Sequence, residues 1–514
     1  MLRRSADIAA LVVAGTAVAG CAAEDRAGSS PTGSTGTTVA ASSRGTARSA
    51  GATSSDALFV ELDDKIQAAM ARHAVPGAAV AVLHDGHEHV RGYGTLSVDS
   101  SVRVDEHSLF RIGSTTKTFT GTAVMRLVEA GKVDLDATVR TYVSELSVAD
   151  EAVAAQVTVR QLLNHTAGWL GDVLQDFGRG DDAIARYVAS MADVPQLTPV
   201  GSTFFYNNAG FVLAGRLVEK VHGTTYEKAV QDLVLDPLGL DETRYFTDEL
   251  VGRTFAASHG VVEGKAVMDP SLWYLPRSLH PTGGLISSAR DQMKYLRFHL
   301  GGGTGPAGER LLRPELLSAM HSQPGPGGTL YVELDGYAMS FQVRPTAEGV
   351  KVVQHGGDWP GQRSGFLFIP ERNFGMTVLT NSDGGLQLLP DLFIDDWALS
   401  RFAGVHNLPA EPEDRTGAQL APYAGRYAQD VIDDTGRTVT TTSDVTVEGG
   451  RLRIRAVGPD GRVVADAASA DLALYDGDYA VYTTGIAARV DFVRGPNGDV
   501  AWLRNAARLQ RKIA

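Results

Sequence analysis

Two stretches that read as β-hairpins lie far apart in the chain, and much of the sequence between them has helical periodicity. Residues 77–94 contain two strand-like runs around an Asp-Gly pair, and residues 365–381 contain two more around a turn at 370–373. Between the hairpins, apolar residues recur at helical spacing after positions 119 and 211. This order predicts an α+β fold, in which both ends of a domain build one antiparallel sheet that is flanked by helices and an all-helical layer.

The C-terminal part of the chain follows a different pattern. Residues 416–514 consist of short strand-like runs separated by Gly and Asp turns, which predict a small all-β, barrel-like module. Residues 406–415 are rich in proline and acidic residues and read as a linker. Because 514 residues are too many for one ordinary core, we expect two folded domains, at 56–405 and 416–514.

The N-terminal residues read as export and tethering signals. Two arginines precede an apolar run over 8–19, as in a secretory signal, and the following Val-Ala-Gly-Cys resembles a bacterial lipobox. Its Cys21 is the single cysteine of the chain. We expect residues 1–21 to be a lipoprotein signal peptide and residues 22–55 to be a flexible Ser/Thr/Gly/Ala tether. The protein would then be exported and held on the outer face of the cell membrane by a lipid on Cys21; the alternative is a plain secretory signal with an incidental cysteine.

Charge and ligand chemistry exclude several classes of function. The formal net charge of -13 argues against nucleic-acid binding, which usually needs a basic face. A lone cysteine cannot build a thiolate metal site. His84, His87 and His89 alternate with acidic residues on the first hairpin, a pattern more typical of a solvated edge than of a ligand set. We expect neither a metal nor another cofactor.

Ser114 and Lys117 form the first candidate catalytic pair, at the start of a predicted helix. Positions i and i+3 share a helix face, about 5–6 Å apart between Cβ atoms. A serine hydroxyl needs a base to become a good nucleophile, and a free lysine with a pKa near 10.4 is too strongly protonated to serve. Burial and the positive end of the helix dipole would both lower that pKa. By itself the pair is a weak signal, because a solvated lysine and a capping serine would look the same.

The second candidate element is Tyr206 with Asn208. In an extended segment, residues two apart project to the same side. A phenol can pass protons to or from a leaving group, and an amide can hold a substrate carbonyl and a lysine together. The structural alternative is a surface asparagine that caps the helix predicted over 209–222; both roles are compatible.

The third candidate element is the run His355-Gly356-Gly357 at the end of a strand-like stretch. Two glycines at a strand end allow another molecule to approach the backbone closely. A single histidine before two glycines is weak evidence, since a turn histidine would give the same pattern.

Together the three elements resemble the serine β-lactamase and penicillin-binding protein superfamily, whose motifs are S-x-x-K, Y-x-N and K-T-G or a variant. Here they are Ser114 to Lys117, Tyr206 to Asn208 and His355 to Gly357. The phrases "LLNHTAGW", "TPVGSTFFYNNAGFVLAG" and "TGGLISSARD" look like the class C β-lactamase-related branch of this superfamily. The resemblance covers roughly residues 56 to 405, and it implies the β-lactamase/DD-peptidase fold.

The resemblance also implies a mechanism without metal or cofactor. Ser114 would attack an amide or ester carbonyl, and Lys117 and Tyr206 would share the roles of base and acid. The N–H groups of Ser114 and Asp358 would form the oxyanion hole, and water would release the acyl-enzyme. Asn208, His355, Gly356, Gly357 and Asp358 would then bind the substrate.

The chain departs from the family pattern at His355, where penicillin-recognising members carry a lysine that helps to bind a substrate carboxylate. We expect His355 at the edge of the cleft, outside the proton path, and able to change its charge near pH 6.5. Some carboxypeptidases of the family carry His at this place. Residues 420–428 resemble the opening of the lipocalin-like modules often found at the C-terminus of family members; such a module could be structural or could shape the cleft.

These expectations favour an exported serine hydrolase that acts on small peptide, amide or ester substrates. The first choice is a DD-carboxypeptidase or D-aminopeptidase-like activity on peptides of D-amino acids. A carboxylesterase and a weak β-lactamase are the alternatives within the family, while the export signal counts against the branch that cyclises peptides. From a different class comes a receptor that captures acyl donors without turnover.

Overall fold

The computed structural model describes residues 54–458 and 469–514. Its centre is a seven-stranded antiparallel sheet in the order β2-β1-β13-β12-β11-β10-β9. The strands are β1 (Gly77–His84), β2 (His87–Gly94), β9 (Gly336–Tyr337), β10 (Gln342–Pro345), β11 (Lys351–Trp359), β12 (Gln362–Ile369) and β13 (Phe374–Thr380). The two predicted hairpins are β1–β2 and β12–β13, and β1 pairs with β13. The sheet predicted from both ends of the domain is therefore confirmed.

The N-terminal predictions fall mostly outside the described residues. These are the signal peptide at 1–21, the lipidation site Cys21, and the tether as far as residue 53. Helix α2 (Ser54–Arg72) includes the last two residues of the expected tether. Within the described part of the chain, no helix is both long and apolar enough to cross a bilayer.

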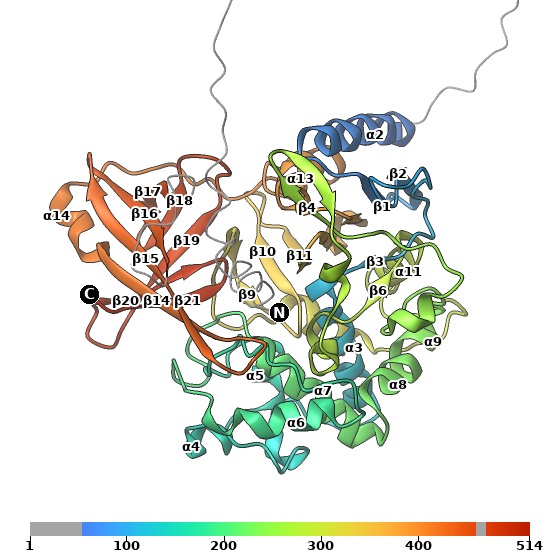
Figure 1. Ribbon diagram of the computed structural model, residues 1–514, viewed down its shortest axis with the longest axis horizontal. Helices are drawn as coiled ribbons and strands as arrows, with labels where there is room; N and C mark the ends of the chain where they lie inside the picture. Colours follow the sequence, from blue (N-terminus) through green and yellow to red (C-terminus); the bar gives the residue numbers. More distant parts are fainter. Residues whose placement is uncertain (1–53, 459–468) are drawn as a thin grey trace, which may run out of the picture.

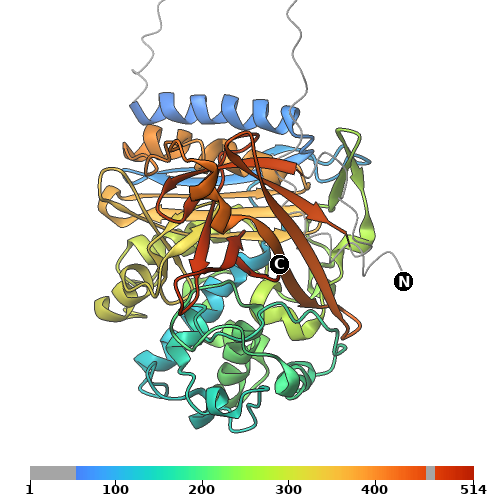
Figure 2. The ribbon, with the colours of Figure 1, turned by 90° about the vertical axis from the view of Figure 1, so that its left-hand side faces the viewer.

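Helices cover both faces of the sheet (Figure 2). On one face lie α2 and α13 (Gly385–Phe393), and on the other lie α11 (Ala289–Leu300) and the helical layer. Strand β1 shows why both faces must be covered, because its side chains alternate between two cores. Val80 and Val82 pack into the core beneath α2, whereas Ala79, Ala81 and Leu83 pack into the larger core on the helical side.

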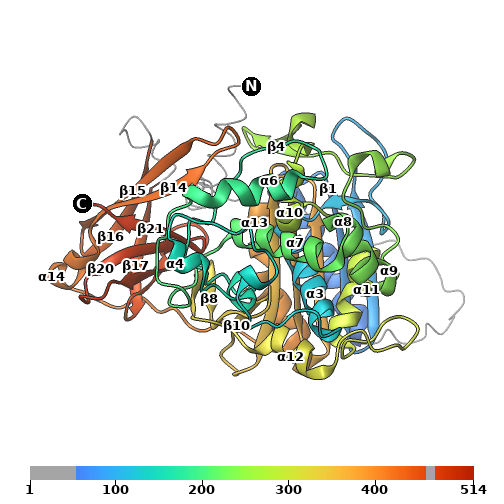
Figure 3. The same ribbon diagram turned by 90° about the horizontal axis from the view of Figure 1, so that it is seen from below.

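The helical layer is built around two helices, α3 (Thr116–Glu129) and α7 (Asn208–His222), which pack against each other beneath the sheet (Figure 3). Around them lie α4 (Glu151–Ala154), α5 (Val159–Leu163), α6 (Ala183–Ser190), α8 (Tyr226–Val230), α9 (Asp236–Leu238), α10 (His280–Gly283) and α12 (Pro314–Ser322). Three small two-stranded sheets complete the domain: β3 (Phe110–Arg111) with β6 (Ile286–Ser287), β4 (His259–Val262) with β5 (Lys265–Met268), and β7 (Gly328–Leu330) with β8 (Val332–Leu334).

The C-terminal module is a closed eight-stranded antiparallel barrel, as the strand-only pattern predicted. Its strands are β14 (Gly425–Ile432), β15 (Thr438–Glu448), β16 (Arg451–Val457), β17 (Ser469–Asp476), β18 (Tyr479–Tyr482), β19 (Arg489–Arg494), β20 (Val500–Asn505) and β21 (Arg508–Lys512). Apolar side chains such as Tyr427, Leu452, Leu472, Val490 and Leu503 form a buried core in this module.

The barrel lies beside the first domain and is docked on it (Figure 1). The hairpin β7–β8 of the first domain faces β19, where Tyr331 and Arg489 form a β-bridge and Thr329 donates a hydrogen bond of 2.7 Å to Asp491. The Arg489 guanidinium also pairs with the Glu333 carboxylate at 2.6 Å. The expected linker at 406–415 is held near both of its own ends, through a bridge from residue 407 to the first domain and a backbone hydrogen bond from residue 413 to the barrel.

Candidate active site

The Ser114 side chain lies at the point where a short strand turns into a helix. Strand β3 leads into a single 3₁₀ turn at Gly113–Thr115, and α3 follows directly. Gly113 has a φ of 47°, and a Cβ at this position would lie 2.9 Å from the backbone nitrogen of Asp358. Glycine therefore lets the turn press against β11, which leaves the Ser114 hydroxyl partly exposed at the junction.

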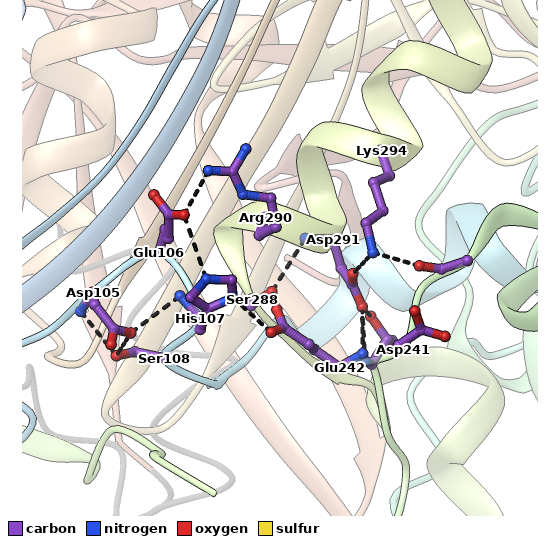
Figure 4. Close-up of polar contacts among 12 residues, drawn as sticks. Asp105, Glu106, His107, Ser108, Asp241, Glu242, Ser288, Arg290, Asp291 and Lys294 are labelled. Atoms are coloured by element: carbon purple, nitrogen blue, oxygen red, sulfur yellow. Dashed lines mark hydrogen bonds and ion pairs between the residues drawn. The ribbon is translucent and has the colours of Figure 1, made fainter. Parts of the chain in front are cut away.

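A partly buried polar network braces the segment that leads to Ser114 (Figure 4). Just before β3, His107 pairs with Glu242 at 2.7 Å, and Glu106 pairs with Arg290 at 2.6 Å. The Asp291 carboxylate, in the first turn of α11, accepts the backbone N–H of Glu242 at 2.8 Å. These contacts tie the segment before β3 to α11 and to the loop that carries Glu242.

Lys117 is placed to remove the Ser114 proton. Its side chain is fully buried, and its Nζ donates to Ser114 Oγ at 3.2 Å and to the carbonyl oxygen of Thr282 at 2.8 Å. Burial holds the pKa of Lys117 well below its usual value; the charge of Arg508 lowers it further, and that of Asp172 opposes the shift. An amine with so low a pKa has a large neutral fraction, and a neutral amine can accept the serine proton.

The Tyr206 ring lies over the same amine. Its centroid is 4.8 Å from Lys117 Nζ, and its hydroxyl is buried without a hydrogen bond of good geometry to any described residue. Burial raises the pKa of Tyr206, while Arg508 and the nearby Ser114 side chain act in the opposite direction. A protonated phenol beside the nucleophile and the base can donate to a departing group.

The two asparagines after Tyr206 have different roles. Asn207 caps α7, because its side-chain oxygen accepts the backbone N–H of Gly210 at 2.8 Å. Asn208 instead turns toward the cleft, and its Nδ2 donates to the Asp172 carboxylate at 2.7 Å. The alternative in which Asn208 caps this helix is therefore wrong, since the neighbouring asparagine fills that position. Tyr206 and Asn208 both line the cleft, as their spacing predicted.

His165 supports Tyr206 from behind, although it was not among the residues selected from the sequence. Its ring stacks on Tyr206 with 4.7 Å between centroids, and its Nδ1 accepts the backbone N–H of Asn207 at 2.9 Å. Burial keeps the pKa of His165 well below its usual value, with the charge of Lys117 acting in the same sense. A neutral imidazole with Nδ1 unprotonated is what this contact requires.

Strand β11 forms the opposite side of the reaction centre. A Cβ on Gly357 would lie 1.8 Å from the carbonyl oxygen of Ile112, so only glycine lets β11 run this close to the turn that carries Ser114. Trp359 and Gln362 form the pair that flanks the two-residue turn to β12. Along an antiparallel ladder, hydrogen-bonded pairs alternate with non-hydrogen-bonded pairs, and the pair at such a turn is hydrogen-bonded. The backbone N–H of Asp358 therefore points away from β12 and toward the cleft, where it can join the N–H of Ser114 as an oxyanion donor.

The structure corrects the expectation for His355. This side chain is 2% exposed and lies among aromatic rings, with centroids 6.2 Å from Tyr206 and 5.9 Å from Tyr337. Burial lowers the pKa of His355 to about 3, helped by the charge of Lys117. The expected change of charge near pH 6.5 and the position at the cleft edge are therefore wrong, because neighbouring rings that are remote in sequence exclude water from the imidazole.

Arg508, from the barrel, completes the reaction centre. The turn from β20 to β21 brings it in: the carbonyl oxygen of Ala507 accepts the backbone N–H of Tyr206 at 2.7 Å. The Arg508 guanidinium carbon lies 4.4 Å from the Tyr206 ring centroid, and its Nε pairs with Asp172 at 3.1 Å. Neither Arg508 nor Asp172 stands in a recognisable motif, so nothing in the sequence pointed to them.

The resulting cleft has a volume of about 320 Å³. It is lined by Ser114, Tyr206, Asn208, His355, Gly356, Gly357 and Asp358, and also by side chains of the barrel. Within the described part of the chain, no group of three or more His, Cys, Asp or Glu side chains is arranged to hold a metal ion. The geometry supports acyl transfer to Ser114.

Comparison with known proteins agrees with this geometry. The sequence profile of the Beta-lactamase family matches residues 62–397. The chain belongs to the Beta-lactamase family. It is 34% identical to penicillin-binding protein 4 of Amycolatopsis lactamdurans over 375 residues, which are 71% of this chain and 97% of that protein. It is 26% identical to the unguisins hydrolase of Aspergillus violaceofuscus over 442 residues, which are 72% of this chain and 75% of that protein.

Among solved structures, SurE superposes on this Beta-lactamase family member with a TM-score of 0.70 at 26% identity, covering 90% of this chain and all of SurE. SurE with D-Leu superposes with a TM-score of 0.68 at 25% identity, covering 89% of this chain and all of that chain. D-amino acid amidase from Ochrobactrum anthropi shares the fold, with a TM-score of 0.54 at 24% identity, covering 66% of this chain and 99% of the amidase chain. The chain is thus a serine hydrolase of the β-lactamase and penicillin-binding protein type.

Proposed function

We propose that the chain hydrolyses small peptides of D-amino acids through an acyl-enzyme on Ser114, as a DD-carboxypeptidase or D-aminopeptidase-like enzyme. One observation carries the proposal: a fully buried amine, Lys117 Nζ, lies 3.2 Å from the hydroxyl of Ser114 and is anchored by the Thr282 carbonyl. No carboxylate of the described residues forms a hydrogen bond with this amine. A buried lysine of this kind is costly to a fold, and general-base catalysis gives it a purpose.

In the first half of the reaction, neutral Lys117 takes the proton of Ser114 as the oxygen attacks the substrate carbonyl carbon. Negative charge develops on the carbonyl oxygen, where the N–H groups of Ser114 and Asp358 stabilise it. The tetrahedral intermediate collapses when the bond to the leaving group breaks and Tyr206 donates a proton to that group. Lys117 then returns its proton to Tyr206.

In the second half, the acyl group is transferred from Ser114 to water. The same pair acts in reverse: Tyr206 and Lys117 remove a proton from water, and Ser114 is protonated as it leaves. Asn208 can donate to the acyl carbonyl side of the substrate while its partner Asp172 holds it in place. The roles of His355, Gly356 and Gly357 are to shape the cleft and to expose the backbone of β11 to the substrate.

The substrate class rests on the relatives and on the electrostatics of the cleft. The names of similar proteins include a penicillin-binding protein, a hydrolase of unguisins, and a structure with D-Leu. These names support a peptide substrate with a D-residue. A second candidate is a neutral ester, which the uncharged His355 favours, because an imidazole with a pKa of about 3 offers a carboxylate no positive charge at neutral pH.

The assignment of Ser114 is tested with a fluorophosphonate probe and a substrate panel. Wild-type protein should be labelled once per chain, and Ser114→Ala should abolish both labelling and turnover; Ser318→Ala, on the exposed side of α12, is the control. The panel should contain a D-Ala-D-Ala peptide, a D-amino-acid amide, a short ester and a chromogenic cephalosporin. Labelling of the Ser114→Ala protein at wild-type stoichiometry would refute the proposal, and a burst of acylation without steady turnover would favour a receptor.

We also propose that the protein is exported and held at the membrane by a lipid on Cys21. The proposal rests on the sequence before residue 56, where an apolar run, the single cysteine and a polar tether follow one another. Cys21→Ser should move the protein from the membrane fraction to the soluble fraction, and metabolic labelling with a fatty acid should be lost. Wild-type protein that is soluble after export would contradict the anchor.

A further inference from the structure

The cleft extends beyond the reaction centre into an apolar space beside the barrel, which we call the barrel lobe. Leu386, Leu389 and Phe393 of α13 line one wall, and Tyr331 and Ile486 line the other. Ile486 belongs to the segment between β18 and β19, so the barrel itself supplies part of this wall. The lobe is therefore built from both domains.

Helix α13 carries a second apolar stripe, of which Leu389 and Phe393 are only partly covered by the core beneath α2. Leu388 and Leu392, four residues apart, are fully buried in the core beneath α2. Leu386, Leu389 and Phe393 follow one another at the same spacing of three and four residues, and they remain only half-buried along the cleft. A helix with a second apolar stripe beside a cavity favours an apolar ligand in that cavity.

The floor of the lobe is made of two glycines that are paired on neighbouring strands. Gly356 of β11 pairs with Gly365 of β12. A Cβ on Gly365 would lie 2.5 Å from the Phe393 ring, so this glycine admits the aromatic side chain. A Cβ on Gly356 would meet only the Ser364 carbonyl oxygen, at 3.5 Å, so the space above Gly356 is open. Open space thus remains close to Asp358, whose N–H is one of the two oxyanion donors.

Tyr331 lines the same cleft as Asp358 and Arg508 of the reaction centre. Arg508 in turn lies on the Tyr206 ring, and Tyr206 is the group that protonates the leaving group in the proposed mechanism. Tyr206, Arg508, Tyr331 and the lobe thus belong to one continuous cleft.

We propose that the barrel lobe binds a bulky apolar side chain of the leaving group, so that the enzyme prefers peptides that release an apolar amino acid larger than alanine. This inference rests on the proposed hydrolase function. In the step concerned, the bond from Ser114 Oγ to the carbonyl carbon forms, the bond from that carbon to the leaving nitrogen breaks, and the Tyr206 proton goes to the nitrogen. The lobe holds the side chain of the departing residue throughout this step.

The test uses two dipeptides with the same N-acetyl-D-alanyl group and either D-Ala or D-Leu as the leaving residue. We expect kcat/KM to be about tenfold higher for the D-Leu substrate, because a few buried methylene groups give discrimination of this order. Leu389→Gln keeps the length and helix propensity of the side chain, and it should lower kcat/KM for the D-Leu substrate about tenfold more than for the D-Ala substrate. Gln387→Ala, on the same helix but away from the cleft, should change neither value.

A second variant on the other wall, Ile486→Ser, keeps the inference testable if Leu389→Gln fails to fold in a thermal melt, and it should reduce the same preference. Equal kcat/KM for the two substrates, or a preference that survives both variants, overturns the inference. A preference that appears only when leucine is moved to the acyl side also overturns it. In each of these cases, Ser114 still reacts with the fluorophosphonate, and the proposed function stands. A protein that neither reacts with the probe nor turns over either substrate would instead contradict the proposed function.

Discussion

The two domains differ in the ionisable groups that they bury. In the first domain, which also contains ion pairs such as Glu106–Arg290, burial lowers the pKa values of Lys117, His321 and His355. The barrel keeps its charges and pairs them, as in the ion pairs Arg426–Asp444 at 2.6 Å and Arg504–Asp491 at 2.9 Å. Neutral buried groups are chemically poised, whereas paired charges mainly fix geometry.

Arg508 links the ionisable groups of the two domains. It is a barrel arginine with a carboxylate partner, yet that partner, Asp172, belongs to the first domain. Its charge lowers the pKa of Lys117, one of the buried groups of the first domain. The comparison therefore predicts that catalysis depends on glycine packing within the first domain and on one charge supplied by the second.

The largest expected effect is that of Gly357→Ala. The new Cβ would meet the Ile112 carbonyl oxygen at 1.8 Å and would push β11 away from the turn that carries Ser114. We expect kcat/KM to fall by about 10²- to 10³-fold, because the oxyanion donors no longer converge. Gly356→Ala is the matched control and should lose far less, since its Cβ has open space. Similar losses in both variants would show that close approach at residue 357 is not what matters.

The next effect is that of Arg508→Ala, which we expect to lower kcat/KM by about 10²-fold. It removes a positive charge near Lys117 and leaves the Asp172 carboxylate unpaired, so the pKa of Lys117 should rise. Since the neutral amine is the active base, the acidic limb of the pH–rate profile should move to higher pH. Arg508→Lys keeps the charge and should restore the limb in part. A profile that does not move would mean that Arg508 acts only on substrate position.

A smaller effect concerns acid stability. Burial lowers the pKa values of His321 and His355 to about 3. Below pH 6.5, the unfolded chain therefore binds protons at these histidines that the folded domain does not bind. Stability is fully present above pH 6.5 and falls as the pH drops toward 3, by about 2 kcal/mol per histidine at pH 5. The sequence from 416 to 514 contains no histidine. Calorimetry from pH 7 to 5 should show the first domain losing stability faster than the barrel, and His321→Phe should reduce the difference; parallel losses would contradict it.

The smallest effect is expected from cutting the linker. Trypsin acts after Arg415, but the contacts of the barrel with Tyr206, Thr329 and Glu333 remain after cleavage. The nicked protein should elute as one species in gel filtration and keep most of its activity. Thr329→Val combined with Arg489→Ala removes two of the contacts and should let the fragments separate. Separation of the wild-type fragments would show that the docking depends on chain connectivity.

Local signals explain which parts of the molecule could be predicted. The hairpins β1–β2 and β12–β13 have alternating patterns and turn residues, and the segments at Ser114, Tyr206 and Gly357 combine residue types that the chemistry needs at short spacing. These features are encoded within a few neighbouring residues, so the sheet, the helical layer and the approximate site followed from the sequence.

Contacts between distant parts of the chain explain the features of the site that could not be predicted from the sequence. Arg508 is one arginine of an ordinary barrel strand, and only the contact of the β20–β21 turn with Tyr206 gives it a role. The protonation state of His355 depends on Tyr206 and Tyr337, which approach it from distant parts of the chain. The capping of α7 by Asn207 in place of Asn208 depends on a shift of one residue in the start of that helix. Contacts of these kinds are set by tertiary packing and leave no local pattern.

The position of Arg508 has a consequence for the time at which the enzyme becomes competent. Arg508 stands almost 400 residues after Ser114 in the chain. At a synthesis rate of about 5–20 residues per second, the nucleophile precedes the arginine by roughly 20–80 s. During this interval, Asp172 lacks its partner and Lys117 lacks the charge that helps to keep it neutral. The order of the domains therefore acts as a delay, and a growing chain carries its serine long before that serine is fully reactive.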